Sequence, residues 1–176
     1  MRKNINTKKM ILNAILIAIG ALLHQITPAL GLPMQPDFAV AILFIIILIN
    51  KDYKTTILVS IIIGIITALT TKFPVGQLPN IIDKLVSGHV IYITFKIMGD
   101  KFSDNIKIVF GLVFGTLISG LSFLGSAFLI SGLPGGFISL FLVAVLPATI
   151  LNGIIGPVLY KAILTALRTT GVLVNK

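Results

Sequence analysis

The chain of 176 residues contains no cysteine and no glutamate, and only 11% of its residues are charged. A typical soluble domain has about 25% charged residues and a polar surface, so this composition argues against a soluble globule. The lack of cysteine excludes a disulfide scaffold, a thiol nucleophile and thiolate metal ligands. With 56% apolar residues, the chain is too hydrophobic to be disordered. The class that remains is a polytopic membrane protein.

Long apolar runs cover most of the chain, and a membrane-spanning helix needs about 20 mainly apolar residues. The last run contains Pro147 and Pro157, which predicts a tilted or kinked helix because an internal proline removes a helix hydrogen bond. We therefore expect an all-α protein in which residues 1–176 form a single transmembrane domain with six membrane-spanning helices. The predicted spans are residues 10–23 with an extension to 30, then 38–50, 57–70, 81–98, 106–130 and 137–167.

The first span follows a basic N-terminus and so resembles a signal peptide. No small-x-small cleavage site follows it, and five further spans favour a first helix that is retained.

Basic residues are unequally divided between the two predicted faces. Twelve of the 14 Lys and Arg residues lie on the side of the N-terminus, scattered singly rather than clustered as nucleic-acid binding requires. The positive-inside rule makes this side cytoplasmic and places both termini inside. The outer loops, residues 28–37, 71–80 and 131–137, are rich in Pro and Gly. The formal net charge of +9 thus lies on the predicted cytoplasmic side and indicates how the chain is oriented in the membrane. On the outer side, the positive charges of Lys72 and Lys84 balance the negative charges of Asp37 and Asp83.

Ionisable and strongly polar residues at membrane depth are costly and indicate functional sites. Seven stand out, and span four is the richest in them. They are His24 and Gln25 in span one, Asp37 at the start of span two, Asp83, Lys84 and His89 in span four, and Asn152 in span six.

The start of span four has a structural and a functional interpretation. Asn80 would be a good N-cap, and Asp83 three residues later would complete a capping-box-like start. That interpretation leaves Lys84 unexplained, because a cation is unfavourable in the first turn of a helix. Asp83 and Lys84 are expected to point about 100° apart and so not simply to pair with each other. Facing inward, Lys84 could receive a carboxylate, and Asp37 or Asp83 an amine.

No catalytic or cofactor motif is present. The sequence has no HExxH, no Walker loop, no GxSxG and no nucleotide fingerprint. His24 and His89 could be metal ligands or proton relays, but a structural hydrogen bond is the preferred interpretation for each. We therefore expect no metal, no cofactor and no enzymatic activity.

Aromatic residues near the outer face include Phe73 and Phe137. Together with isolated charges of both signs, they suit a small amphoteric aromatic ligand, because ligand sites are mostly apolar with a few placed polar groups. Four spans also carry small residues spaced by four, such as Ala14 and Ala18 in span one. Such stripes pack helices within one protein or against a partner.

Several segments together resemble the bacterial tryptophan transporter (TrpP-type) family. The most specific is TKFPVGQLPNIIDK at residues 71–84. Weaker pieces are Met34-Gln35-Pro36-Asp37, the run GLPGGF at 132–137, and Leu146-Pro147-Ala148 followed by Leu151-Asn152. AIGALLH at 18–24 is also similar, and the resemblance covers nearly the whole chain. Gln35 departs from the lysine expected there.

The resemblance implies uptake of tryptophan across the bacterial cytoplasmic membrane, with binding at the extracellular face. Lys84 would then meet the carboxylate and Asp37 or Asp83 the ammonium, while Phe73 and Phe137 hold the indole. His24 is a further residue of this candidate site. The N–H group of the ligand's indole would bind Gln77, Asn80 or Asn152.

The family is similar in size and topology to the substrate-capturing S components of energy-coupling-factor transporters. This likeness implies that Ala14 and Ala18 dock on a transmembrane coupling protein that works with separate ATPase subunits, and that the odd-numbered loops close over the ligand. Two alternatives stay open: an S component for another small nutrient such as a vitamin, and a membrane scaffold that transports nothing.

Overall fold

The computed structural model of the chain describes residues 2–27 and 37–169. These residues form helices and, within the described ranges, no strand, which confirms the all-α prediction. The helices are α1 (Arg2–Ile26), α2 (Phe38–Asn50), α3 (Tyr53–Leu69), α4 (Gln77–Met98), η1 (Gly99–Lys101), α5 (Asp104–Ser131) and α6 (Phe137–Leu140), followed by the π-helical η2 (Phe141–Val145) and α7 (Leu146–Thr169).

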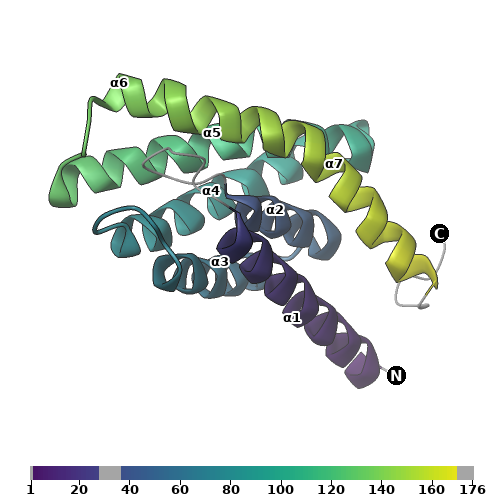
Figure 1. Cartoon of the computed structure of the whole chain (residues 1–176). Coiled ribbons are helices and arrows are strands. Elements are labelled where there is room, and N and C mark those ends of the chain that lie inside the picture. Colours follow the sequence, from purple (N-terminus) through teal and green to yellow (C-terminus); the bar gives the residue numbers. More distant parts are fainter. Residues whose placement is uncertain (1, 28–36, 170–176) are drawn as a thin grey trace.

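Helix α2 lies at the centre of the bundle and contacts α1, α3, α4, α5 and α7 (Figure 1). Every residue from Ala39 to Leu48 is buried. The sequence of α2 explains this position, since a helix that is apolar all round can be covered on every side. Asp37 caps its N-terminus by accepting hydrogen bonds from the backbone N–H groups of Ala39 (2.9 Å) and Val40 (3.4 Å).

The next helix, α3, begins with a comparable cap. The Asp52 carboxylate accepts hydrogen bonds from the Thr55 backbone N–H at 2.8 Å and from the Thr55 hydroxyl at 2.7 Å. These bonds lower the pKa of the exposed Asp52 carboxyl below its usual value, because they stabilise the charged form.

Small residues allow α5 to approach α2 and α4 closely. A Cβ atom on Gly115 would overlap the ring of Phe44, and one on Gly111 would lie 2.5 Å from Cζ of Phe95. Gly156 of α7 similarly faces Leu112 of α5. The stripes of α5 and α7 thus pack within the protein, as small residues do between membrane helices. The α1 stripe differs, because Ala14 and Ala18 are exposed.

Within the part of the chain that the structure describes, three helices are long and apolar enough to cross a membrane: Thr7–Ile26, Asp104–Ser131 and the continuous helical run Phe137–Thr169. Helices α2 and α3 are apolar but shorter. The last helical run changes direction along its length in Figure 1. It contains a π-helical turn just before Pro147 and carries Pro157 inside α7, which are recognised causes of helix bends.

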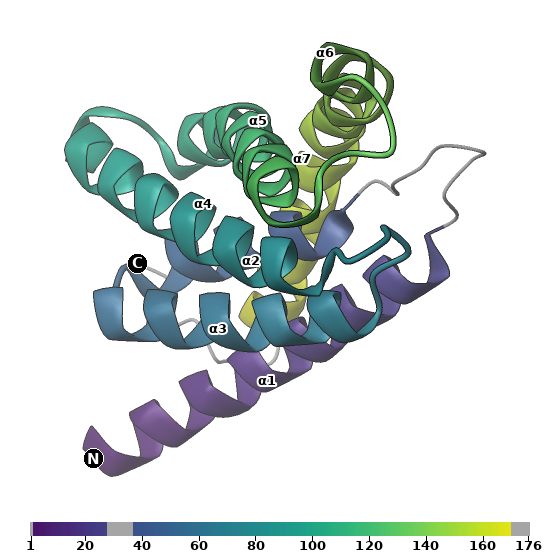
Figure 2. The ribbon, with the colours of Figure 1, turned by 90° about the vertical axis from the view of Figure 1, so that its left-hand side faces the viewer.

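The two ends of the bundle differ in composition. Loops 70–76 and 132–136 lie at one end (left in Figure 1; Figure 2 faces this side), which we call the proline-rich end. Loops 51–52 and 99–103 lie at the other end, together with the start of α1 and the end of α7. This lysine-rich end contains Lys51, Lys54, Lys96, Lys101 and Lys107. Among the described residues, the predicted Pro- and Gly-rich outer loops at 71–80 and 131–137 therefore lie at the same end of the bundle.

Candidate functional site

Three charged side chains meet inside the bundle. The Lys84 ammonium of α4 is only 1% exposed and lies 2.6 Å from Oδ2 of Asp37 and 2.6 Å from Oδ2 of Asp83. The expectation that Asp83 and Lys84 would not pair was wrong, because the four-carbon lysine side chain bends back across the helix surface to its neighbour. We call these three residues the Asp–Lys–Asp cluster.

Each aspartate of the cluster is held by a second group. The Ser119 hydroxyl of α5 donates to Oδ1 of Asp83 at 2.6 Å. Nδ1 of His24 lies 3.1 Å from Oδ1 of Asp37, which also caps α2. The cluster therefore joins α1, α2, α4 and α5, and its two carboxylates outnumber its one ammonium.

Helix α4 begins earlier than the sequence predicts. Gly76 is its N-cap and has no side-chain capping bond, so the prediction that Asn80 caps this helix was wrong. Asn80 instead lies one turn inside, where its side-chain amide donates to the Gly76 carbonyl at 2.8 Å. The reason is that Pro79 fits the first turn of a helix, where its missing N–H costs nothing, so the proline does not delay the start.

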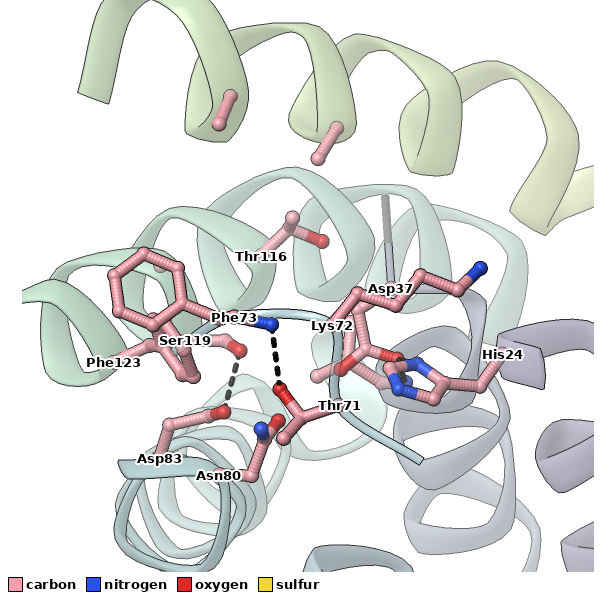
Figure 3. A pocket seen from close by; sticks show the side chains of 14 residues that line it. His24, Asp37, Thr71, Lys72, Phe73, Asn80, Asp83, Thr116, Ser119 and Phe123 are labelled. Carbon is pink, nitrogen blue, oxygen red and sulfur yellow. Dashed lines mark hydrogen bonds and ion pairs between the residues drawn. The ribbon is translucent and has the colours of Figure 1, made fainter. Parts of the chain in front are cut away.

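A cavity of about 60 Å³ opens beside the cluster (Figure 3). Asp37 and Asp83 line it, whereas Lys84 is not among the lining residues. Phe73 and Phe123 form an aromatic wall, with ring centroids 5.1 Å apart and planes at 85°. The remaining lining is made by His24, Val40, Thr71, Lys72, Asn80, Thr116, Ser119, Gly120, Ala144 and Ala148.

Two further polar groups complete this region. Lys72 lines the cavity and donates to the backbone carbonyl of Thr27 at 2.8 Å. Asn152 of α7 is fully buried, and its amide nitrogen donates to the Asp37 carbonyl at 3.2 Å and to the Thr116 hydroxyl at 3.1 Å. Its Oδ1 accepts no hydrogen bond from the described residues.

The structure thus brings together most of the predicted site: His24, Asp37, Phe73, Asn80, Asp83, Lys84 and Asn152. Gln77 and Phe137 are not part of it, because both are exposed and neither lines the cavity. His89 lies elsewhere and pairs with the Tyr53 hydroxyl at 3.0 Å. Among the described residues, no group of three His, Cys, Asp or Glu could hold a metal ion.

Sequence reasoning did not assign Ser119, Thr116 or Phe123 to the site. In the sequence, Ser119 stands four residues after Gly115 and so continues the pattern of small residues on α5. A hydroxyl within such a stripe, placed to face a buried carboxylate on the neighbouring helix, is the signal that could have found it.

The family model described as "Tryptophan transporter TrpP" matches residues 6–168. A relative from Clostridium acetobutylicum, named "Probable tryptophan transport protein", is 47% identical over 163 residues, covering 93% of this chain and 95% of its own. Relatives of the same name from Clostridium perfringens and Bacillus subtilis are 46% and 42% identical, and each match covers more than nine tenths of both chains. No solved structure matches the chain.

Proposed function

This chain belongs to the tryptophan transporter TrpP family, and we propose that it takes up tryptophan by binding the amino acid at the Asp–Lys–Asp cluster. It is a multi-pass protein of the cell membrane and belongs to a family of transport proteins, from which we infer that it is not an enzyme. The observation that carries the proposed site is the buried Lys84 held between two carboxylates beside an aromatic-walled cavity.

The charges of the cluster suit a zwitterion. The tryptophan ammonium would bind Asp37 or Asp83, which face the cavity, and its carboxylate would take the place of that aspartate on Lys84. The ligand would then sit between an aspartate and the lysine, so that every buried charge stays paired. This pairing matters because an unpaired charge at membrane depth costs several kcal/mol. Lys72, at the cavity wall, would add positive charge near the carboxylate.

The cavity must widen to accept the ligand. At about 60 Å³ it is far smaller than the roughly 300–1,000 Å³ pockets that hold small-molecule ligands. Loop 70–76 supplies Thr71, Lys72 and Phe73 to the lining, so outward movement of this loop would open the cavity and its return would enclose the indole. Phe73 and Phe123 would then contact the ring, with Asn80 or the Oδ1 atom of Asn152 accepting its N–H.

Phe73→Ala is expected to weaken tryptophan binding about tenfold, since truncating a buried aromatic anchor typically costs one to two kcal/mol. Phe137→Ala is the matched control, because Phe137 begins α6 outside the cavity. Calorimetric titration of both purified variants compares their Kd values. If both variants bound tryptophan equally more weakly, the indole would not be in contact with Phe73.

We propose further that six helical spans cross the membrane, with the lysine-rich end and both termini in the cytoplasm and the cavity open to the outside. The support is the concentration of Lys and Arg at one end. Because the native chain has no cysteine, single cysteines report the topology directly. A membrane-impermeant maleimide should label Ser131→Cys in intact cells and Lys101→Cys only after permeabilisation. The opposite labelling pattern would show that the lysine-rich end faces the outside.

A substrate-capture role is favoured by the exposure of Ala14 and Ala18 on α1, which fits docking on a transmembrane coupling protein. Ala18→Phe is then expected to abolish uptake by cells while leaving tryptophan binding unchanged. Leu22→Phe, at an exposed large residue on the same helix, is the control. Concentrative uptake by the purified protein alone in liposomes would exclude this mechanism and indicate a self-sufficient transporter.

A further inference from the structure

A second cavity, of about 250 Å³, lies at the lysine-rich end between α2, α4 and α5. Lys51, Lys96 and Lys107 line it, together with Asp100, and Leu48, Tyr92 and Phe95 supply an apolar wall. We call it the lysine cavity. It shares no lining residue with the cavity beside the Asp–Lys–Asp cluster.

Lys107 is the unusual residue of this cavity. It lies near the start of α5, where the helix dipole disfavours a cation, and its side chain is only 5% exposed. Its one ion pair within the described ranges is to Oδ1 of Asp104 at 3.3 Å, and the same oxygen lies 3.5 Å from the Lys51 ammonium. Asp104 is itself 46% exposed.

The contrast with Lys84 shows what Lys107 lacks. Lys84 is also buried and has two carboxylates at 2.6 Å, whereas Lys107 shares one half-exposed carboxylate with another lysine. Lys51 and Lys96 have a simpler explanation, because they lie at the ends of α2 and α4, where cations stabilise the terminal carbonyls. That explanation does not extend to Lys107, so a buried ammonium there calls for another anion.

We propose that the lysine cavity binds a phosphate group, with Lys107 at its buried side and Lys51 and Lys96 at its rim. Three ammonium groups against Asp100 and Asp104 leave the excess positive charge that such an anion neutralises. Basic pockets between helices at the cytoplasmic side of membrane proteins bind lipid phosphates, and the wall of Leu48, Tyr92 and Phe95 suits the apolar part of such a lipid. A free phosphate ion would use the same lysines.

The test uses the full-length purified chain without tryptophan, so its result is independent of the proposed transport site. Thermal unfolding is followed in nanodiscs of phosphatidylcholine, whose choline already neutralises its phosphate, with and without the anionic phosphatidylglycerol. A second series compares inorganic phosphate with chloride in detergent at equal ionic strength. We expect saturable stabilisation of the native chain and of Lys101→Gln, an exposed control at the same end. Lys107→Gln should bind the phosphate group at least about tenfold more weakly, as expected for loss of a charge-assisted hydrogen bond.

Stabilisation by phosphatidylglycerol alone identifies a lipid headgroup as the source, and stabilisation by inorganic phosphate identifies the free ion; both support the site. If Lys107→Gln does not fold, Lys107→Arg should keep the response and Lys96→Gln should weaken it relative to Lys101→Gln. The absence of any response in the native chain, or an equal response in the lining variants and Lys101→Gln, would overturn the proposal.

Discussion

Lys84→Met is expected to abolish tryptophan binding, with a loss of at least about 100-fold in affinity, and to lower the free energy of unfolding by about 3–5 kcal/mol. Both effects have one cause. Without the ammonium, the buried carboxylate of Asp83 and the partly buried carboxylate of Asp37 have no cation between them. The ligand carboxylate also loses its only fully buried cation in the site.

The measurement is a titration of tryptophan into the purified variant, beside a thermal unfolding curve. Lys72→Met is the control, because Lys72 lines the same cavity but is bonded to a backbone carbonyl rather than to an aspartate. We expect Lys72→Met to bind less than about tenfold more weakly, as for a partly exposed charge. An unchanged tryptophan affinity in Lys84→Met would show that Lys84 does not bind the carboxylate of tryptophan.

The double variant Lys84→Met, Asp83→Asn should recover most of the stability that Lys84→Met loses, while tryptophan binding stays absent. The reason is that removing both members of a buried ion pair is far less costly than stranding one charge. The amide oxygen of the side chain that replaces Asp83 would still accept the hydrogen bond from the Ser119 hydroxyl, and Asp37 would keep its backbone partners at the start of α2.

Unfolding midpoints of the native chain, the two single variants and the double variant form a complete cycle, and a coupling energy of about 1–3 kcal/mol is expected between the two positions. Asp104→Asn combined with Lys84→Met serves as the control, because Asp104 lies at the opposite end of the bundle. Strictly additive effects of Lys84→Met and Asp83→Asn would show that the pair has no energetic link.

Hydrophobic runs predicted the helices well, because burial and lipid exposure both require apolar side chains. The limits of α2 were predicted to the residue, since Asp37 before it and the charged Lys51-Asp52 after it interrupt the apolar run. The start of α4 was missed by four residues, because Gln77 and Pro79 look like loop residues although both fit a first helical turn.

The site was predictable in membership but not in geometry. Asp37, Asp83 and Lys84 stood out because charged residues are rare at membrane depth. Their pairing depended on the lysine rotamer and on how α2 packs against α4, which no local pattern encodes. Phe73 and Phe137 looked equivalent in sequence, and only the path of loop 70–76 places Phe73 inside.

The central claim is that the protein recognises both charges of tryptophan at one buried cluster. The chain contains no tryptophan residue, so indole fluorescence in a sample of the purified protein comes from the ligand alone. Titrations with tryptophan, tryptamine and indole-3-propionate should show saturable binding of tryptophan and about 30-fold or more weaker binding of each analogue, because each leaves a buried charge unmatched. Equal binding of tryptamine or indole-3-propionate, or no binding of tryptophan, would contradict the account.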